Sequence, residues 1–456
     1  MSPSAQRRGV AYRRPIRRKP LWLEQLEDRV VPTVIELTSA GATGAFNGAL
    51  FYQSSSGTGI DTIVRLASNQ TIEQGFNSNF RPVQFDENTN SQYTHAVQLS
   101  SVPTVISAGG LAYYEFLLNI NQLSSSPLLS VDELRFYVTN SSTVDPTLLH
   151  NYSVTAHTLQ DDSGKLYSPV YDLNPATPAG NYIKLDYSLA TGNGTGDMVA
   201  LLPVTSLGTD PNQYVYLYSK LGVHFANNDG FDEWSTADTL PVGSISGVTF
   251  VDTNGNGLRD AGEPGVAGVN VFLDANNNGV LDPGEVSTVT AADGSFSFSR
   301  LLAGTYHVRE VLPAGWIETA NINSNVSLAS GQNATGVALG NFKLGTISGT
   351  KFEDVTGNGF SADDPVLNGA NPDFVPVTMQ LLKGSSVVAT TTTGNDGNYT
   401  FTGIGPGTYT VAEVKPNGWI QTATSNGAIT ATSGFAASDN FDNYRVAFLL
   451  NNVLAV

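Results

Sequence analysis

Hydrophobic and polar residues alternate along much of the chain in short runs, the pattern typical of β-strands. In SFSF (295–298) and TYHVR (305–309), apolar and polar residues alternate. Successive side chains of a strand point to opposite faces, so such runs bury one face and expose the other. The runs are separated by turn sequences such as DG, G-T and P-x-G. The pattern therefore predicts an all-β protein built from sandwiches.

Residues 33–240 form one predicted domain, a β-sandwich or jelly roll. TPAGNYIKLDYSL (177–189) and NQYVYLYSKLGVHF (212–225) are typical of strands. Within the second run, one face carries Tyr214, Tyr216 and Tyr218, and the other carries Val215 and Leu217. A tyrosine stripe more often covers a core, and stacking against sugars is the alternative. The acidic stretches at 161–164 and 227–234 are expected to be solvated turns, and ion binding is the alternative.

The second half of the chain contains a duplication of about 100 residues. ISGVTFVDTNGNG (245–257) recurs as ISGTKFEDVTGNG (347–359), and ADGSFSF (292–298) recurs as NDGNYTF (395–401). We expect two tandem sandwiches over 243–343 and 345–445, with Trp316 and Trp419 in their cores.

Two acidic loops in the first unit have the spacing of a calcium loop. DTNGNGLRDAGE (252–263) and DANNNGVLDPGE (274–285) both fit D-x-[DN]-x-[DN]-G-x5-E. A hard cation needs six to eight oxygen ligands, and Ca²⁺ tolerates looser geometry than Mg²⁺. The predicted ligands, with the backbone carbonyl at the seventh place, are Asp252, Asn254, Asn256, Leu258, Asp260, Glu263, Asp274, Asn276, Asn278, Val280, Asp282 and Glu285.

The residues after each loop distinguish it from a helix–loop–helix site. PGVAGVNVFL and VSTVTAADG are glycine-bearing and alternating or β-branched, so both loops are expected to join strands. The alternative is that both stretches are Asx turns that bind no metal.

The second unit departs from the pattern. Its loop begins with Asp354, Thr356 and Asn358, but Ala362 stands at the ninth place and Pro365 at the twelfth. LLKGSSVVATTTT (381–393) replaces the second loop. We therefore expect weaker or no calcium binding in this unit.

Residues 243 to about 445 resemble the B-type repeats of the SdrD family of bacterial surface adhesins and, more distantly, the B modules of collagen adhesins. The resemblance lies in the D-x-N-x-NG loop, the DG turn before an aromatic strand, and the G-T-Y-x-V…P-x-G-W close. It implies immunoglobulin-like or transthyretin-like sandwiches that bind Ca²⁺ and act in tandem as a stalk.

The collagen-adhesin resemblance also implies a possible cross-link. Those modules can carry a Lys–Asn isopeptide bond promoted by a Glu, for which Lys351, Glu413 and Asn440 or Asn443 are the candidates. Thr249 stands at the lysine position of the first unit. We expect instead that these residues are ordinary polar residues of the surface and of edge strands, without a cross-link.

Charge limits the partners. The total is −18, yet the first twenty residues hold seven basic residues and no acid, which leaves −25 on the rest. Such a body repels nucleic acid and anionic membranes and attracts divalent cations. Cysteine is absent, so disulfides cannot stabilise the small domains, and metal is the obvious substitute.

The sequences of the two termini indicate where the protein is located in relation to the cell. LEQLEDRVVP (23–32) is similar to an N-terminal motif of planctomycete extracellular proteins, which implies that residues 1–32 serve export. A basic arm that binds polyanions is the alternative. The tail VAFLLNNVLAV (446–456) is too short to span a membrane and favours a strand.

Enzymatic patterns are absent from the sequence. It contains no H-E-x-x-H, P-loop or G-x-S-x-G motif. We therefore expect a non-enzymatic extracellular or cell-surface protein that binds matrix, polysaccharide or a surface protein. The alternative is a carbohydrate-binding or hydrolytic domain at 33–240 carried on spacer repeats.

Overall fold

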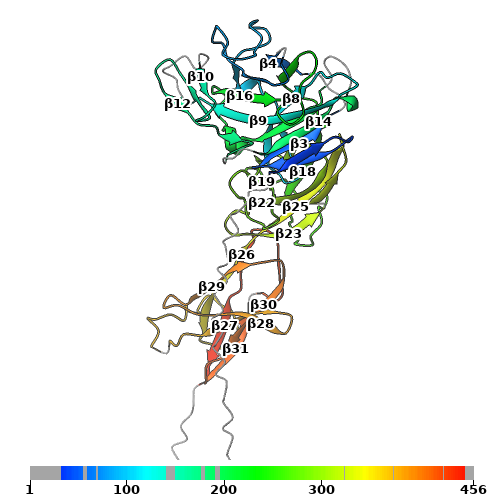
Figure 1. Cartoon of the computed structure of the whole chain (residues 1–456). Coiled ribbons are helices and arrows are strands. Elements are labelled where there is room, and N and C mark those ends of the chain that lie inside the picture. Colours follow the sequence, from blue (N-terminus) through cyan, green and yellow to red (C-terminus); the bar gives the residue numbers. More distant parts are fainter. Residues whose placement is uncertain are drawn as a thin grey trace, which may run out of the picture.

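A computed structural model describes residues 32–446, except 55–58, 68–69, 140–148, 176–179, 191–195, 323, 373 and 425. The predictions for residues 1–31 and 447–456 lie outside this range. The described residues form an elongated, almost entirely β molecule in which three sandwiches follow one another (Figure 1). None of the described helices is long and apolar enough to cross a membrane.

The first sandwich packs two sheets around one large core. Trp234, Phe116 and Phe136 lie fully buried in it. One sheet contains, in order, β1 (Val34–Leu37), β14 (Tyr182–Asp186), β9 (Leu128–Val138), β16 (Tyr214–Leu221) and β5 (Glu73–Phe76). In the same sheet β13 (Tyr171–Asp172) pairs with β9, and β6 (Val97–Gln98) pairs with β16. The other contains β2 (Thr43–Phe46), β3 (Ala49–Gln53), β15 (Met198–Pro203), β8 (Ala112–Asn119), β7 (Thr104–Ile106), β17 (Asp232–Thr236) and β4 (Asp61–Leu66). The short helices are η1 (Leu99–Ser101), η2 (Tyr187–Leu189) and α1 (Val204–Leu207).

Strand β16 is buried on both faces. Val215 and Leu217 belong to the main core, whereas Tyr216 and Tyr218 belong to a second cluster and are fully buried. A small sheet of β10 (His150–Ser153), β11 (Thr158–Gln160) and β12 (Leu166–Tyr167) contributes the covering side chains. One of these, Tyr152, stacks on Tyr218 with ring centroids 4.0 Å apart. The core interpretation is confirmed for Tyr216 and Tyr218, whose faces are covered and cannot stack on a sugar, while Tyr214 is half-buried and packs against the same cluster.

The two acidic turns are less solvated than predicted. Asp161 is 3% exposed, and its Oδ1 accepts hydrogen bonds from the N–H groups of Ser163 and Lys165. Asn227 is 4% exposed, and its side chain hydrogen-bonds Glu73 and Gln122. Both side chains are used inside the protein, so the solvated interpretation is wrong for these two residues.

The second and third sandwiches repeat one topology, as the duplication predicts. The first module pairs β21 (Ser295–Leu301), β18 (Gly243–Val251), β25 (Asn333–Lys343) and β23 (Trp316–Ile322) against β20 (Ser287–Val289), β19 (Asn270–Leu273), β22 (Gly304–Glu310) and β24 (Asn325–Leu328). The second pairs β29 (Asn398–Ile404), β26 (Gly345–Asp354), β34 (Phe441–Arg445), β31 (Trp419–Thr424) and β33 (Ala436–Ser438) against β28 (Ser386–Thr392), β27 (Thr378–Lys383), β30 (Gly407–Val414) and β32 (Ile429–Ala431). Trp419 is buried as expected, but Trp316 is only half-buried.

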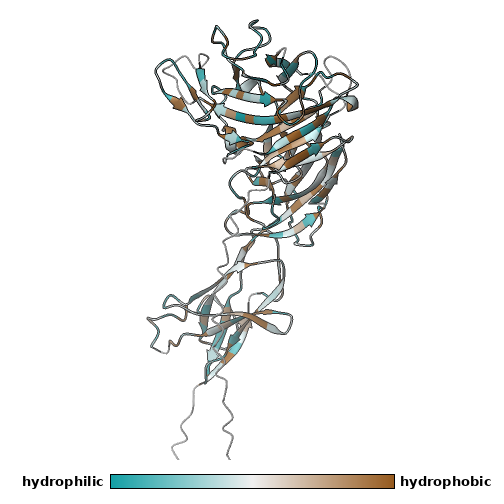
Figure 2. Ribbon diagram, in the orientation of Figure 1, coloured by the Kyte–Doolittle hydropathy of each residue, from teal (hydrophilic) through white to brown (hydrophobic). Residues whose placement is uncertain are grey.

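Apolar side chains are shared between the sandwiches as well as within them. Brown, hydrophobic segments occur on strands of all three sandwiches in Figure 2. Phe342 and Ile317 of the first module pack into the core of the second. Ile106 of the first sandwich packs against the core of the first module. The three sandwiches are therefore joined by contacts in addition to the chain itself.

The first junction also includes sheet pairing. Strand β21 of the first module continues the sheet that ends in β7, and Leu302 N donates to Ile106 O at 2.9 Å. The Arg300 guanidinium makes two hydrogen bonds to the Asp238 carboxylate, of 3.1 and 2.7 Å. This planar pairing fixes orientation as well as distance.

Candidate metal sites

The loop at 252–263 starts directly after β18 and curls around a buried carboxylate. Asp252 is 0% exposed, and its Oδ1 accepts hydrogen bonds from Gly255 N (2.7 Å) and Asn256 N (3.1 Å). Its Oδ2 accepts one from Gly257 N at 2.8 Å. Gly257 has a φ of +76°, a left-handed conformation that a glycine adopts without steric cost.

The side chains at the third, fifth and ninth places converge on one point. The amide nitrogens of Asn254 and Asn256 both lie 2.8 Å from Asp260 Oδ2. Glu263, at the twelfth place, accepts from Thr253 N (2.7 Å) and Asp260 N (2.9 Å). The loop is thus closed on itself by its own predicted ligands.

The loop at 274–285 has closely similar hydrogen bonds. Asp274 is 2% exposed and accepts from Asn278 N (3.0 Å) and Gly279 N (2.8 Å). Asn276 and Asn278 both donate to Asp282 Oδ2 at 2.8 Å. Glu285 accepts from Ala275 N (2.7 Å) and Asp282 N (2.9 Å). Two sequences that share a pattern therefore share a local fold.

At the seventh place, Leu258 and Val280 occupy the outer side of each loop. Their side chains are 59% and 58% exposed, and their N–H groups donate to Asn256 Oδ1 and Asn278 Oδ1. Among the described residues, no helix follows either loop. The chain passes instead to a bridge between Gly265 and Phe250 after the first loop, and to β20 after the second.

The chemistry of each loop fits a hard cation. Each provides three carboxylates, two carboxamides and backbone carbonyls, the ligands that Ca²⁺ prefers. The carboxamide nitrogens face the ninth-place carboxylate, and a half-turn of each amide group would present its oxygen there instead. Within the described residues, however, the three carboxylates of neither loop form a cluster with oxygens within 4.8 Å of one another. The structure therefore brings the third, fifth and ninth places together, while Asp252, Glu263 and their counterparts bind backbone N–H groups.

The two loops lie at opposite ends of the first module, each against a neighbouring sandwich. In the first loop, Thr253 O accepts from Ser433 N of the second module at 2.9 Å. Gly255 lies so near Pro406 that an added Cβ would stand 2.0 Å from the Pro406 Cβ. In the second loop, Glu285 forms a β-bridge with Leu111 of the first sandwich.

A third acidic group lies in the second module. Asp354 ends β26 and accepts backbone N–H groups of Gly357 (2.5 Å) and Gly359 (2.9 Å). Asp364 accepts from Ser361 N, three residues earlier, as Glu263 does from Asp260. Both lie near Asp442 of β34. Burial, followed by the negative charges of Asp364 and Asp354, raises the pKa of Asp442 to about 6.

The surface interpretation of Lys351 and its neighbours is wrong. The side chains of Lys351 and Glu413 are 1% and 0% exposed, and Nζ lies 3.3 Å from Oε2. Burial lowers the pKa of Lys351 to about 8, against the opposing effect of Glu413. Asn443 is buried without a hydrogen-bond partner for its amide group, whereas Asn440 Oδ1 accepts from Thr350 N at 2.9 Å.

The first module replaces this ion pair by hydrogen bonds without a lysine. Thr249 stands at the lysine position, and its hydroxyl donates to Val266 O at 2.8 Å. Glu310, the counterpart of Glu413, accepts from Asn341 Nδ2 at 2.9 Å. Burial raises the pKa of Glu310 to about 7.

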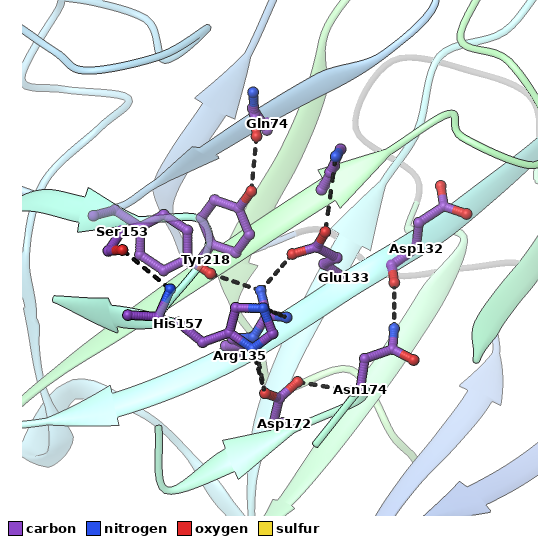
Figure 3. A network of polar contacts seen from close by, with 12 residues as sticks. Gln74, Asp132, Glu133, Arg135, Ser153, His157, Asp172, Asn174 and Tyr218 are labelled. Carbon is purple, nitrogen blue, oxygen red and sulfur yellow. Dashed lines mark hydrogen bonds and ion pairs between the residues drawn. The ribbon is translucent and has the colours of Figure 1, made fainter. Parts of the chain in front are cut away.

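A buried polar network, which the sequence did not indicate, holds the small sheet over the tyrosine face (Figure 3). Arg135 of β9 is fully buried and forms ion pairs with Glu133 and with Asp172, whose Oδ2 lies 2.9 Å from Nε. Its Nη1 donates to the Tyr152 hydroxyl at 2.6 Å. The His157 ring lies 3.2 Å from Nη2. The network connects β9 to the β10–β11 turn and serves as a structural anchor.

Comparison with known proteins identifies the second half of the chain. The SdrD B-like domain family matches residues 243–348 and 345–448. The chain contains two tandem SdrD B-like domains. The repeated topology described above is thus that of these domains, and the predicted resemblance is confirmed.

Curated relatives match over the same part of the chain. Serine-aspartate repeat-containing protein F of Staphylococcus epidermidis is 30% identical over 200 residues, covering 41% of this chain and 12% of that protein. Proteins E and D of Staphylococcus aureus are 31% identical over 195 and 202 residues, covering 41% of this chain and 16% and 14% of those proteins. The chain thus spans less than one fifth of the length of these relatives.

Solved structures are similar at low sequence identity. A streptococcal ancillary pilin is 14% identical with a TM-score of 0.24, covering 70% of this chain and 94% of the pilin. The minor pilin of Streptococcus agalactiae is 12% identical with a TM-score of 0.20, covering 45% of this chain and 96% of that pilin.

Proposed function

We propose that this chain is a non-enzymatic, adhesin-like structural protein of the cell surface, in which two SdrD B-like domains carry the first sandwich as a stalk. In this proposal Ca²⁺ binds both loops of the first module and fixes its two junctions. The ligand of residues 33–240 would be extracellular matrix, a polysaccharide or a surface protein. The net charge of −18 disfavours nucleic acid and anionic membranes as partners.

The observation that carries the proposal is the placement of the loops. One loop contacts the second module through Thr253 and Ser433, and the other contacts the first sandwich through Glu285 and Leu111. A loop that holds a cation is fixed by its ligands, and a fixed loop restricts whatever packs against it. Calcium bound at both ends of one module would therefore stiffen the stalk on each side of it.

Charge supports a role for a cation in making the loops rigid. Each loop concentrates three carboxylates, and Asp252 and Asp274 are almost completely buried. Without a counter-ion these negative charges repel one another, and a divalent cation converts the repulsion into attraction. The free energy of cation binding then adds to the free energy of folding.

The test is to measure distances across each junction by pulsed electron spin resonance on the full chain. The chain has no cysteine, so Ser39→Cys with Ser327→Cys reports the first junction, and Ser327→Cys with Ser386→Cys the second. We expect Ca²⁺ to narrow both distance distributions. Asp260→Asn with Glu263→Gln should remove the narrowing only at the second junction, and Asp282→Asn with Glu285→Gln only at the first. Distributions of equal width with and without Ca²⁺ would rule the proposal out.

A further inference from the structure

Two buried carboxylates flank the end of strand β8 in the first sandwich, outside the two SdrD B-like domains. Strand β8 lies between β15 and β17, and its Leu118 pairs with Met198 on one side and with Trp234 on the other. Asp197 directly precedes β15, and Asp232 is the first residue of β17. The two aspartates therefore approach the same end of β8 from the strands on either side of it.

Each carboxylate binds the backbone just beyond the end of β8. Asp197 Oδ2 accepts a hydrogen bond from Ile120 N at 2.8 Å, and Asp232 Oδ1 accepts one from Asn121 N at 2.9 Å. These two N–H groups are consecutive in the chain, so the two carboxylates lie close to one another. Burial raises the pKa of Asp197 to about 8; the hydrogen bond from Ile120 opposes this shift, and the negative charge of Asp232 adds to it.

The second oxygen of each carboxylate indicates a ligand. Asp197 is 3% exposed and Asp232 is 0% exposed, and among the described residues neither Asp197 Oδ1 nor Asp232 Oδ2 has a hydrogen-bond partner. Gln122, on the stretch that follows β8, is 2% exposed, and its Oε1 is also buried without a partner. A buried carboxylate without a partner is costly, and two neighbouring negative charges repel one another in addition.

The protein itself supplies no cation to this pair. Within the described part of the chain, no lysine, arginine or histidine forms an ion pair with Asp197 or Asp232. Arg65 of the adjacent β4 pairs instead with Glu233 and lies over the ring of Tyr93. The compensating charge must therefore come from a proton or from a bound cation. Backbone N–H donors favour the ionised form of a carboxylate, and here each carboxylate accepts one, which favours the cation.

We propose that Asp197 and Asp232 bind one divalent cation at the end of β8, with the amide oxygen of Gln122 as a further ligand and calcium as the ion. The two carboxylates balance the charge of the cation. Ca²⁺ accepts carboxylates, carboxamides and water in irregular arrangements, whereas Mg²⁺ demands near-ideal octahedral geometry, which carboxylates tied to the backbone cannot readily adopt. The cation would hold β15, β8 and β17 together at one end of their sheet, so its binding free energy would add to the stability of the first sandwich.

The first experiment counts the ions bound by the full chain. Both first-module loops are disabled by Asp260→Asn, Glu263→Gln, Asp282→Asn and Glu285→Gln. In this background, isothermal titration calorimetry should find one fewer Ca²⁺ per chain after Asp197→Asn with Asp232→Asn. The control is Asp229→Asn, which removes an exposed carboxylate from the same acidic stretch and should leave the number unchanged. Circular dichroism shows whether each variant folds.

The second experiment requires no substitution at the site. With Trp22→Phe, Trp316→Phe and Trp419→Phe added to the loop-disabled chain, only Trp234 of β17, two residues after Asp232, fluoresces. Its fluorescence reports the unfolding of the first sandwich, and the urea midpoint should rise when Ca²⁺ is added.

An unchanged number of bound ions in the folded Asp197→Asn, Asp232→Asn variant would overturn the proposal, as would a urea midpoint that does not respond to Ca²⁺. Either result would show that a proton, and not a cation, compensates the pair. Because the loops are disabled throughout, these outcomes are independent of whether the first module binds calcium.

Discussion

Addition of millimolar Ca²⁺ to the metal-free full chain is expected to raise the melting temperature of the first module by more than 10 °C. A ligand at 100 times its Kd stabilises the folded state by about 2.7 kcal/mol per site. Two sites therefore add about 5 kcal/mol, and each kcal/mol shifts the Tm of a domain of this size by about 4–8 °C. The measurement is differential scanning calorimetry with and without a chelator.

Variants separate the two loops in this experiment. Glu263→Gln and Glu285→Gln should each remove roughly half of the calcium-dependent rise, because each removes a carboxylate from one loop only. Mg²⁺ at the same concentration should give a much smaller rise, since it demands stricter octahedral geometry. A melting temperature that does not respond to Ca²⁺ would show that both stretches are Asx turns that bind no metal.

Replacement of Arg135 by Leu is expected to destabilise the first sandwich by about 3–5 kcal/mol, the usual cost of removing one partner of a buried ion pair. The change leaves the largely buried carboxylates of Glu133 and Asp172 without the guanidinium, and the Tyr152 hydroxyl loses the same partner. The free energy of unfolding is measured by urea denaturation, followed by the fluorescence of the buried Trp234.

Lys220 provides the matched control. It also approaches Glu133, at 3.7 Å, but its side chain is 23% exposed. A partly exposed ion pair of this length contributes at most about 1 kcal/mol, so Lys220→Leu should have a small effect. Equal losses for the two variants would show that Arg135 is not the anchor of the small sheet.

Features encoded in neighbouring residues were predictable from the sequence. The alternation of apolar residues gave the strands, and the repeated motifs gave the two modules. The turn geometry of the acidic loops also follows from local pattern, because Asp252 and Asp274 bind N–H groups only three to five residues further on. The burial of Tyr216 and Tyr218 beside Val215 and Leu217 fits a strand covered on both faces.

Features that depend on distant pairing were not predictable in the same way. Asp442 follows Asp364 by 78 positions, and no spacing rule indicates that β34 places it against β26 in register with Phe352. Lysine and glutamate usually lie at the surface, and only the packing of two sheets buries Lys351 and Glu413 together. The contacts of the loops with Ser433 and Leu111 likewise require the relative placement of whole sandwiches.

The most direct test of calcium binding by the first module is the number of ions that the full chain binds. Isothermal titration calorimetry should find two fewer Ca²⁺ per chain after Asp260→Asn, Glu263→Gln, Asp282→Asn and Glu285→Gln together, and one fewer when only one loop is changed. An unchanged stoichiometry in the chain with all four substitutions would contradict the account.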